Sequence, residues 1–556
     1  MPKKEFDASI SSVSDGMVFI QKNLEKCLIR KKPLTQALLI CEEAMVRIIN
    51  HATPDAKMQI SIKPRFGTAT VTISAHGTPY SDDSADIDLS GADLGHGSEE
   101  AIRSILLNAY ADRLAYSRTG ECNFVKISAG AKERFFALRT TFSSLLAILV
   151  ALLLSLFVPQ DALHILAENV LLPIQTLFLN ALQLVTAPTV FFCIMMSISR
   201  FASFSDPGKI SGKIMVSYFS TTVLAVVLGA CITKLLPVPQ EIMGAFSYLN
   251  DPTQAVNTGI SPLEMLTTII PDNVIIPFSD TNALQLLMIA VLFGIALGKT
   301  GSYSASLKRM AGALENFFQT TVNLVSDFTP FAVFFVTLLL VFYFGMKAAI
   351  AVLVIAGEVL LGFVSMFLCY ILILSVFGRL NPFMFLRKFQ KNMSELFFSG
   401  SSVSAIPDTL KCCEFKLGVS SIVSNFSIPF GAISNLDGNS VYLSILGLIF
   451  AQLCGITIAG KELVAYLITV ILLSIGSPIT PGSAMLALTM LMNQQGTSLL
   501  ILSFILALNP IFEMILAVCN TVGDVAMTLV VARNEKELDL DMYNRKLPKK
   551  KKKKAI

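Results

Sequence analysis

The sequence lacks tryptophan, and charged residues make up only 15% of its 556 positions. Soluble proteins carry about a quarter charged residues. The deficit reflects long apolar runs such as ALQLLMIAVLFGIALG (283–298), and the stretch 463–512 has no charged residue. Because runs near 20 apolar residues cross membranes, the composition excludes a soluble protein and indicates a polytopic membrane protein. Any interfacial aromatic belt must rely on Tyr and Phe.

Other absences narrow the class further. The ten cysteines have no metal-ligand spacing, so we expect them to be packing residues. No apolar segment flanked by basic residues occurs before residue 130, which predicts no cleaved signal peptide and a cytoplasmic N-terminus. The lysine-rich end, 545–556, indicates a cytoplasmic C-terminus; contact with anionic lipid is the alternative to a merely solvated tail. We expect no nucleic-acid partner.

Residues 1–130 are polar and alternate between helical and strand-like patterns. Segment 34–52 has helical periodicity, and 58–75 predicts two strands around a Gly turn. Segment 93–117 predicts a Gly-rich turn leading into a helix, and 123–129 a last strand. We therefore expect an α+β domain over 1–130, a membrane domain over 131–535 and a basic tail over 536–556.

Membrane spans are predicted to begin near residues 140, 163, 210, 283, 312 and 347. Basic residues at 131–139 precede the first span, and those at 209–213 and 379–391 predict cytoplasmic loops. Segment 238–282, rich in Pro, Asn and Asp, predicts a solvent-exposed insertion.

Two apolar segments are too interrupted to be straight spans. Segment 394–410 contains a serine cluster and Pro407, and 472–488 contains two glycines and two prolines. Each suits a re-entrant helical hairpin with a non-helical tip, which survives at membrane depth only inside protein or beside a wet cavity. A pair of interrupted segments is a sequence pointer to a transporter's binding site.

Three carboxylates lie within the apolar runs of 417–532, without Lys or Arg in the same spans: Asp437, Glu513 and Asp524. Each needs a proton, a basic partner or a metal cation there, since an intramembrane charge costs about 3 kcal/mol or more. Asn435 precedes Asp437, and Asn520 precedes Asp524 by one helical turn. Amide and carboxylate oxygens are hard ligands that suit Na⁺. A buried protonated or helix-capping acid is the alternative.

Four motifs occur in the order typical of the dicarboxylate/amino acid:cation symporter family, the glutamate transporter homologues. SNLDGNS (434–440) resembles that family's NMDGT signature, and SGSSVSAIP (399–407) and SIGSPITPG (474–482) resemble its two hairpin tips. NPIFEMILAVCNTVGD (509–524) resembles its eighth span. The resemblance covers about 135–535. It implies eight transmembrane helices plus two re-entrant hairpins, a homotrimer in the cell membrane, and elevator-type transport in which a domain holding both hairpins moves against a scaffold.

The resemblance also implies three sodium sites. One uses the side chains of Tyr218, Thr221, Thr222, Asn435 and Asp437. A second uses the carbonyls of Gly431, Asn435 and Asn520 with the carboxylate of Asp524. A third uses the carbonyls of Ser474, Ile475 and Ser477. Proton coupling in place of sodium stays open.

The substrate site implied by the resemblance comprises nine residues: Ser401, Ser402, Asn439, Thr480, Gly482, Glu513, Leu516, Ala517 and Asn520. The arginine that holds an acidic substrate's distal carboxylate falls on Leu516, and the alternative arginine falls on Gly400. Without a guanidinium, a second substrate carboxylate would be buried unpaired. We therefore expect a small neutral amino acid; a dicarboxylate or an acidic amino acid is the alternative.

The N-terminal domain resembles the Bergerat-type ATP-binding fold of anti-sigma-factor kinases over about 10–130. The resemblance rests on CEEAMVRIINHA (41–52), ISAHGTPYSDD (73–83) and DLGHGSEEAIRSI (93–105). Arg47 stands where a Mg²⁺-binding Asn belongs, and Ala75 where an adenine-reading Asp belongs, so only Glu43 remains of the chemistry. We expect a degenerate regulatory module that binds a nucleotide or a cytoplasmic regulatory protein, and no enzyme. A membrane solute sensor signalling through this domain is a further alternative.

Overall fold

The computed structural model describes residues 2–27, 31–53, 56–65, 68–78, 114–130, 133–203, 209–239, 269–280, 282–300, 303–344, 346–402, 405–475, 477, 483–495, 497, 499–506 and 508–545. The chain divides into two compact units, Met1–Phe135 and Phe136–Ile556.

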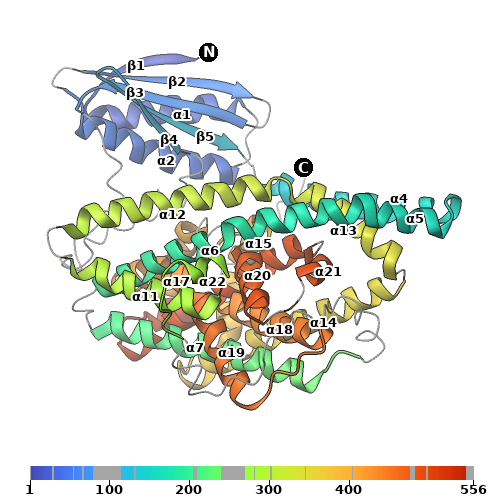
Figure 1. Cartoon of the computed structure of the whole chain (residues 1–556). Coiled ribbons are helices and arrows are strands. Elements are labelled where there is room, and N and C mark those ends of the chain that lie inside the picture. The colour runs from blue at the N-terminus through green and yellow to red at the C-terminus, as the bar shows by residue number, and fades with distance from the viewer. Residues whose placement is uncertain are drawn as a thin grey trace, which may run out of the picture. The chain divides into compact units, whose positions relative to one another are not determined.

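The first unit is an antiparallel sheet with helices on one face (Figure 1). Its elements are β1 (Lys3–Asp7), the 3₁₀ turn Ile10–Ser12, α1 (Val13–Glu25), α2 (Lys31–Asn50), β2 (Lys57–Arg65), β3 (Thr68–His76), β4 (Leu114–Thr119) and β5 (Cys122–Gly130). The sheet order is β1-β2-β3-β5-β4. Alternate strand residues such as Ile60, Val71 and Ile127 are fully buried with Met45 of α2, because successive strand side chains point to opposite faces.

The predicted strands and the helix over 34–52 are confirmed. The helix predicted to run to residue 117 is wrong at its end, because Leu114–Thr119 is the strand β4. Leu114 pairs with Ile127 and Tyr116 with Val125, so sheet pairing prevails over the local helical pattern of this stretch. Residues 79–113, which hold the predicted Gly-rich turn and most of that helix, lie outside the described residues.

The second unit is built of helices. They are α4 (Glu133–Phe157), α5 (Gln160–Leu166), the π-helix Ala167–Leu171, α6 (Leu172–Ser203), α7 (Lys209–Leu235), α10 (Ile276–Ser279), α11 (Ala283–Lys299), α12 (Ser304–Ser326), α13 (Thr329–Phe344), α14 (Met346–Val376), α15 (Pro382–Ser399), α16 (Ile406–Cys412), the π-helix Cys413–Leu417, α17 (Ser421–Ser434), α18 (Asp437–Leu453), α19 (Gly460–Ile475), α20 (Ser483–Gln495), the 3₁₀ turn Leu499–Leu502, α21 (Ser503–Leu506), α22 (Asn509–Asn534) and α23 (Leu540–Asn544).

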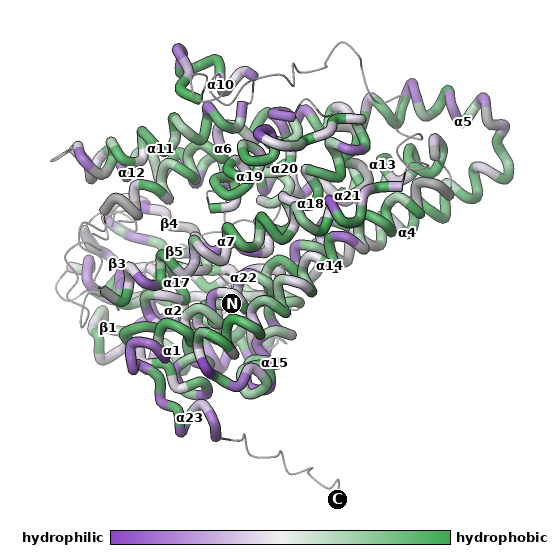
Figure 2. Tube along the Cα trace, turned by 90° about the horizontal axis from the view of Figure 1, so that it is seen from below, coloured by the Kyte–Doolittle hydropathy of each residue, from purple (hydrophilic) through white to green (hydrophobic). Residues whose placement is uncertain are grey.

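Helices begin at or within several residues of the predicted span starts. Among the described residues, five helices are long and apolar enough to cross a membrane, or six if the pair α12–α13, bent by 48°, is one span. Figure 2 shows α4 and α14 as mostly hydrophobic and α23 as hydrophilic. The count of eight spans stays a prediction. The two basic stretches predicted as loops are partly helical, since 209–213 begin α7 and 382–391 form the first half of α15.

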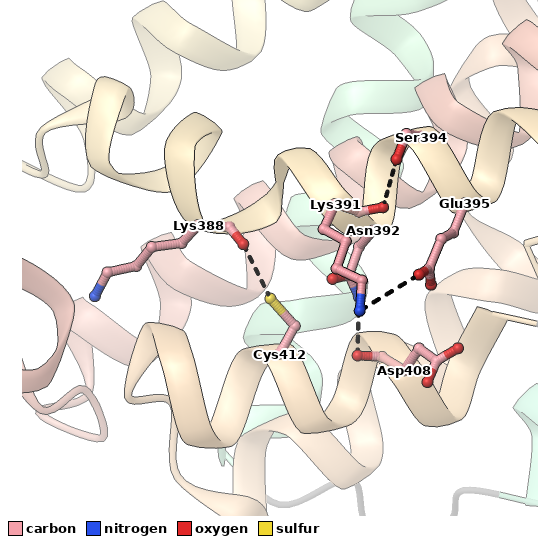
Figure 3. A network of polar contacts seen from close by, with 7 residues as sticks. All are labelled: Lys388, Lys391, Asn392, Ser394, Glu395, Asp408 and Cys412. Atoms are coloured by element: carbon pink, nitrogen blue, oxygen red, sulfur yellow. Dashed lines mark hydrogen bonds and ion pairs between the residues drawn. The ribbon is translucent and has the colours of Figure 1, made fainter. Parts of the chain in front are cut away.

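The first interrupted segment folds back on itself. Gly400 ends α15 in the left-handed region with φ of 64°, a conformation that glycine adopts without steric cost. The Asn392 amide donates to the Asp408 carbonyl (2.9 Å), and the Cys412 thiol contacts the Lys388 carbonyl (3.8 Å) (Figure 3). In each pair the two residues lie equally far before and after residue 400 along the chain. Helices α15 and α16 therefore run antiparallel as a hairpin.

The site lies at the break between helices α17 and α18. Helices α17 and α18 form one almost fully buried run with a break at Asn435 and Leu436, whose backbone angles are not helical. They pack against α22, and α18 also packs against α7 and α14. A buried break of this kind leaves backbone groups free to meet side chains or ions.

Candidate functional site

The helix break carries the first carboxylate. Asp437 is fully buried at the start of α18. Its Oδ1 accepts a hydrogen bond from Thr222 of α7 (3.2 Å), and its Oδ2 accepts one from the hydroxyl of Tyr370 of α14 (2.8 Å). Both donors are neutral, so they orient the carboxylate without balancing its charge.

The second carboxylate is linked to the first through Asn435. Asp524 is fully buried on α22, and its Oδ1 accepts a hydrogen bond from the Asn435 amide (3.0 Å). The side-chain oxygen of Asn435, Oδ1, in turn accepts one from the Thr221 hydroxyl (3.2 Å). The other oxygen of Asp524, Oδ2, is buried and has no hydrogen-bond partner among the described residues. A buried carboxylate oxygen without a donor is the kind of group that a cation would satisfy.

Gly431 makes room for this arrangement. A Cβ atom at Gly431 would lie 2.5 Å from Asp524 Oδ1 and 2.9 Å from the Tyr218 hydroxyl. That hydroxyl donates to the Ser427 carbonyl (2.9 Å) and lies 3.4 Å from the Asp524 carbonyl. The predicted members of the first two sodium sites thus come together from α7, α17, α18 and α22.

The first arm of the second interrupted segment reaches the same break. The Ser474 hydroxyl donates to the Leu436 carbonyl (3.0 Å) and lies 2.5 Å from the Ser440 hydroxyl. Ile475 ends α19, and the Ser477 amide donates to the Ser474 carbonyl (3.3 Å). The third predicted sodium site therefore has one of its residues in contact with the break. Thr480 and Gly482 lie outside the described residues.

Most of the predicted substrate residues gather on the α22 side of the break. The Ser402 hydroxyl of the first hairpin donates to the Ala517 carbonyl (3.3 Å), and Ser401 beside it is half-buried. Asn520 accepts from the Gly438 amide (2.7 Å) and lies 3.5 Å from the Asn439 side chain.

The remaining predicted residues lie along the same helix. Leu516 is buried, and its carbonyl lies close to Gly438. Glu513 is half-buried and accepts a hydrogen bond from Asn509 (2.9 Å), which itself accepts one from Tyr442 (2.9 Å). The Glu513 carboxylate is thereby held by its own helix in this structure.

Sequence reasoning missed Tyr370. It is fully buried on α14, 67 residues before its partner Asp437. The only signal in the sequence was a tyrosine within a mostly apolar run. The structure adds that its hydroxyl points toward Asp437. A buried tyrosine hydroxyl needs a polar partner, and the carboxylate supplies it.

The site therefore contains two buried carboxylates, an amide between them, and hydroxyl groups from α7 and α14. Helices α17 and α18 contain no Lys or Arg, and the only one in α22 is Arg533, near its C-terminal end. Such a set of hard oxygen ligands with net negative charge can hold a hard monovalent cation.

A sequence model of the sodium:dicarboxylate symporter family matches residues 140–534, more than half of the chain. The chain belongs to this family. Family members are secondary symporters, not enzymes, and together with the apolar helices the match makes the chain a multi-pass membrane protein.

Curated relatives agree with the family match. A C4-dicarboxylate transport protein of Bacillus subtilis is 25% identical over 374 residues, covering 66% of this chain and 88% of the relative. Proteins of the same name from Bordetella avium and Rhizobium etli are 24% and 26% identical, covering 74% and 72% of this chain and 93% and 90% of those relatives. The family match lies within the second unit, and the α+β unit lies outside it.

Proposed function

We propose that this chain couples the inward flow of Na⁺ to the uptake of a small carboxylate-bearing solute. One observation carries the proposal: Asp437 and Asp524 are buried together through Asn435, and one oxygen of Asp524 has no hydrogen-bond partner among the described residues. Two ionised carboxylates in a dry site need positive charge, and no Lys or Arg occurs in the helices that carry them near the break. A dissolved cation meets this need and leaves again when the site opens.

The first cation would be held by Asp437, Asn435 and the α7 side chains Tyr218, Thr221 and Thr222. The contacts of Thr222 with Asp437 and of Thr221 with Asn435 support this assignment. The second would be held by Asp524 with the carbonyls of Gly431, Asn435 and Asn520, and the close approach of Gly431 to Asp524 supports it. The third would use the carbonyls of Ser474, Ile475 and Ser477.

The first candidate solute is a C4-dicarboxylate, because the curated relatives carry that name. Their names do not support the neutral amino acid that the sequence predicts. The neutral amino acid stays the second candidate on one observation: a buried leucine, Leu516, occupies the position where the resemblance places an arginine. A dicarboxylate in this position would need another donor for its second carboxylate.

Both hairpins would move with α7, α17, α18 and α22, which hold the cations, as one body against a scaffold of early helices, in a homotrimer with both termini in the cytoplasm. The contacts of Ser402 with Ala517 and of Ser474 with Leu436 support joint movement, because each ties a hairpin to the helices of the site.

The N-terminal unit would be a regulatory module that binds a cytoplasmic protein and hydrolyses no nucleotide. Glu43, the one remaining acid of the resembled ATP site, forms an ion pair with Arg47 (3.1 Å), which supports a structural role for both. A solute sensor is the alternative to a transporter; it predicts binding without flux.

Uptake into proteoliposomes tests the proposal. Succinate, alanine and serine are offered separately, with an inward gradient of either Na⁺ or choline. Sodium-dependent uptake of succinate supports the dicarboxylate, and sodium-dependent uptake of alanine or serine without succinate supports the neutral amino acid. Uptake that is the same in choline removes sodium coupling, and sodium-dependent binding without uptake supports the sensor.

A further inference from the structure

A third buried carboxyl group lies on α14, away from the carboxylate pair. Glu358 has 5% of its surface exposed. It precedes Tyr370, which reaches Asp437, by 12 positions, so the two lie about 18 Å apart along the helix axis at roughly 1.5 Å per residue. Glu358 is therefore not part of the cation site around Asp437.

Glu358 has no partner among the described residues. Its Oε2 is buried without a hydrogen bond, and no ion pair forms to it. One turn further along α14, a Cβ at Gly362 would contact the side chains of Val441 and Ile445 of α18. On α14 itself, Ile355 and Val359 beside Glu358 are buried and apolar. These four side chains offer neither a hydrogen-bond donor nor a counter-charge to Glu358.

The neighbouring helices do carry titratable groups on the Glu358 side of Tyr370. These are Cys231 and Lys234 on α7, Tyr343 on α13, Tyr442 on α18, and Glu513 and Cys519 on α22. None of them makes a hydrogen bond or an ion pair to Glu358. Helix α21 carries no titratable residue, and α15 follows the opposite end of α14.

These surroundings decide whether Glu358 can bind a metal cation or a proton. A metal cation needs several oxygen ligands around it, and the apolar side chains named above supply none. A proton needs only the carboxyl group itself, and the protonated form is the one that apolar surroundings tolerate. The ionised form becomes favourable when water or a cation reaches the group.

We propose that Glu358 is a proton-binding site, so that transport by this chain is linked to protons as well as to sodium. The proposal rests on the proposed transport function for its role in the cycle. Glu358 holds a proton while α14 is packed against α7, α18 and α22, and releases it when those helices move and water reaches the carboxyl group. In each cycle the O–H bond of the Glu358 carboxyl breaks, and the proton passes to water on the side where the site opens.

Infrared spectroscopy of the purified full chain in lipid, with Na⁺ present, tests the site without any solute. We expect a carbonyl band of a protonated, buried carboxyl group in the wild type that is absent in Glu358→Gln. Glu168→Gln is the matched control, because Glu168 is an exposed acid of the same unit, and it should keep the band. Identical spectra for the wild type and Glu358→Gln would overturn the proposal.

Proteoliposomes test the role in transport, with succinate, alanine and serine as probes and a pH-sensitive dye inside. The wild type should acidify the lumen as solute enters, and its uptake at fixed Na⁺ should vary by at most about tenfold per pH unit, as one bound proton allows. Glu358→Gln should lose the acidification and flatten the pH profile. Solute-driven acidification that survives in this variant would contradict the inference.

The two assays together distinguish a failure of the proton site from a failure of the transport function. If Glu358→Gln does not reach the membrane, Glu358→Met, which is apolar and similar in length, replaces it in both assays. If the wild type transports none of the probes but shows the infrared band and loses it with Glu358, the transport function fails while the proton site stands. Sodium-dependent uptake with an unchanged pH profile in Glu358→Gln leaves the transport function intact and removes the proton site.

Discussion

Substitution of Gly431 by alanine should weaken sodium binding through Asp524. The added Cβ would lie 2.5 Å from Asp524 Oδ1 and 2.6 Å from its Cγ, distances at which one of the groups must move. Overpacking costs about 1–3 kcal/mol, and the helix propensity of alanine returns about 1 kcal/mol. The free energy of unfolding should therefore fall by only about 0–2 kcal/mol.

The effect on the cation should be larger than the effect on folding. A displaced Asp524 carboxylate would lose its hydrogen bond with Asn435 (3.0 Å) and its position toward the ion. Disturbing the residues that orient a metal ligand costs about 10–100-fold in affinity. We expect the sodium concentration that gives half-maximal thermal stabilisation of the purified protein to rise by this factor.

Gly212→Ala is the matched control. Gly212 is also a helical glycine of the membrane unit, but a Cβ there would meet nothing within 4 Å. It should bind sodium as the wild type does and unfold at the same or a slightly higher temperature, because alanine favours the helix by up to about 1 kcal/mol. A folded Gly431→Ala protein with wild-type sodium affinity would refute the assignment of Asp524 as a cation ligand.

Three further predictions concern other contacts. Tyr370→Phe leaves Asp437 Oδ2 without its donor; it should cost about 1–3 kcal/mol in stability and weaken sodium binding, as a sodium titration by thermal shift would report. Asn392→Ala removes the hydrogen bond to the Asp408 carbonyl; it should destabilise the first hairpin by about 1 kcal/mol and speed its proteolysis. Burial raises the pKa of the Cys41 thiol, so this cysteine should resist alkylation at pH 8 until its unit unfolds, as mass spectrometry would show.

Each of these has its own control. Tyr303→Phe changes a tyrosine that is 74% exposed and should leave sodium binding alone. Lys391→Ala removes an exposed ion pair with Glu395 and should not change proteolysis of the hairpin. The half-exposed Cys122 should be alkylated before Cys41. A sodium titration of Tyr370→Phe that matches the wild type, equal proteolysis of Asn392→Ala and Lys391→Ala, or early labelling of Cys41 would each contradict the corresponding account.

Local chemistry explains which features could be predicted from the sequence. The left-handed Gly400 and the break at Asn435 lie in clusters of small polar residues, which favour non-helical backbone wherever they occur. The placement of Asn520 and Asp524 on the same side of α22 follows from their spacing of one helical turn. These patterns span only a few residues, so they can be recognised without knowledge of the tertiary structure.

Features that depend on packing between distant segments could not be predicted. Tyr370 reaches Asp437 across 67 residues, and nothing near either residue indicates the other. Strand β4 is held by pairing with β5, although its sequence reads as the end of a helix. Glu358 is a different case, since a count of acids in apolar runs that began before residue 417 would have found it, but only the structure shows that it has no partner.

The central claim, that Asp437 and Asp524 hold the cation that drives transport, is tested most directly by uptake under a sodium gradient in Asp437→Asn and Asp524→Asn. The wild type should take up solute with Na⁺ but not with choline. Both variants, inserted in the membrane to the same level, should lose most of this sodium stimulation. Sodium-stimulated uptake at wild-type level in both variants would contradict the claim.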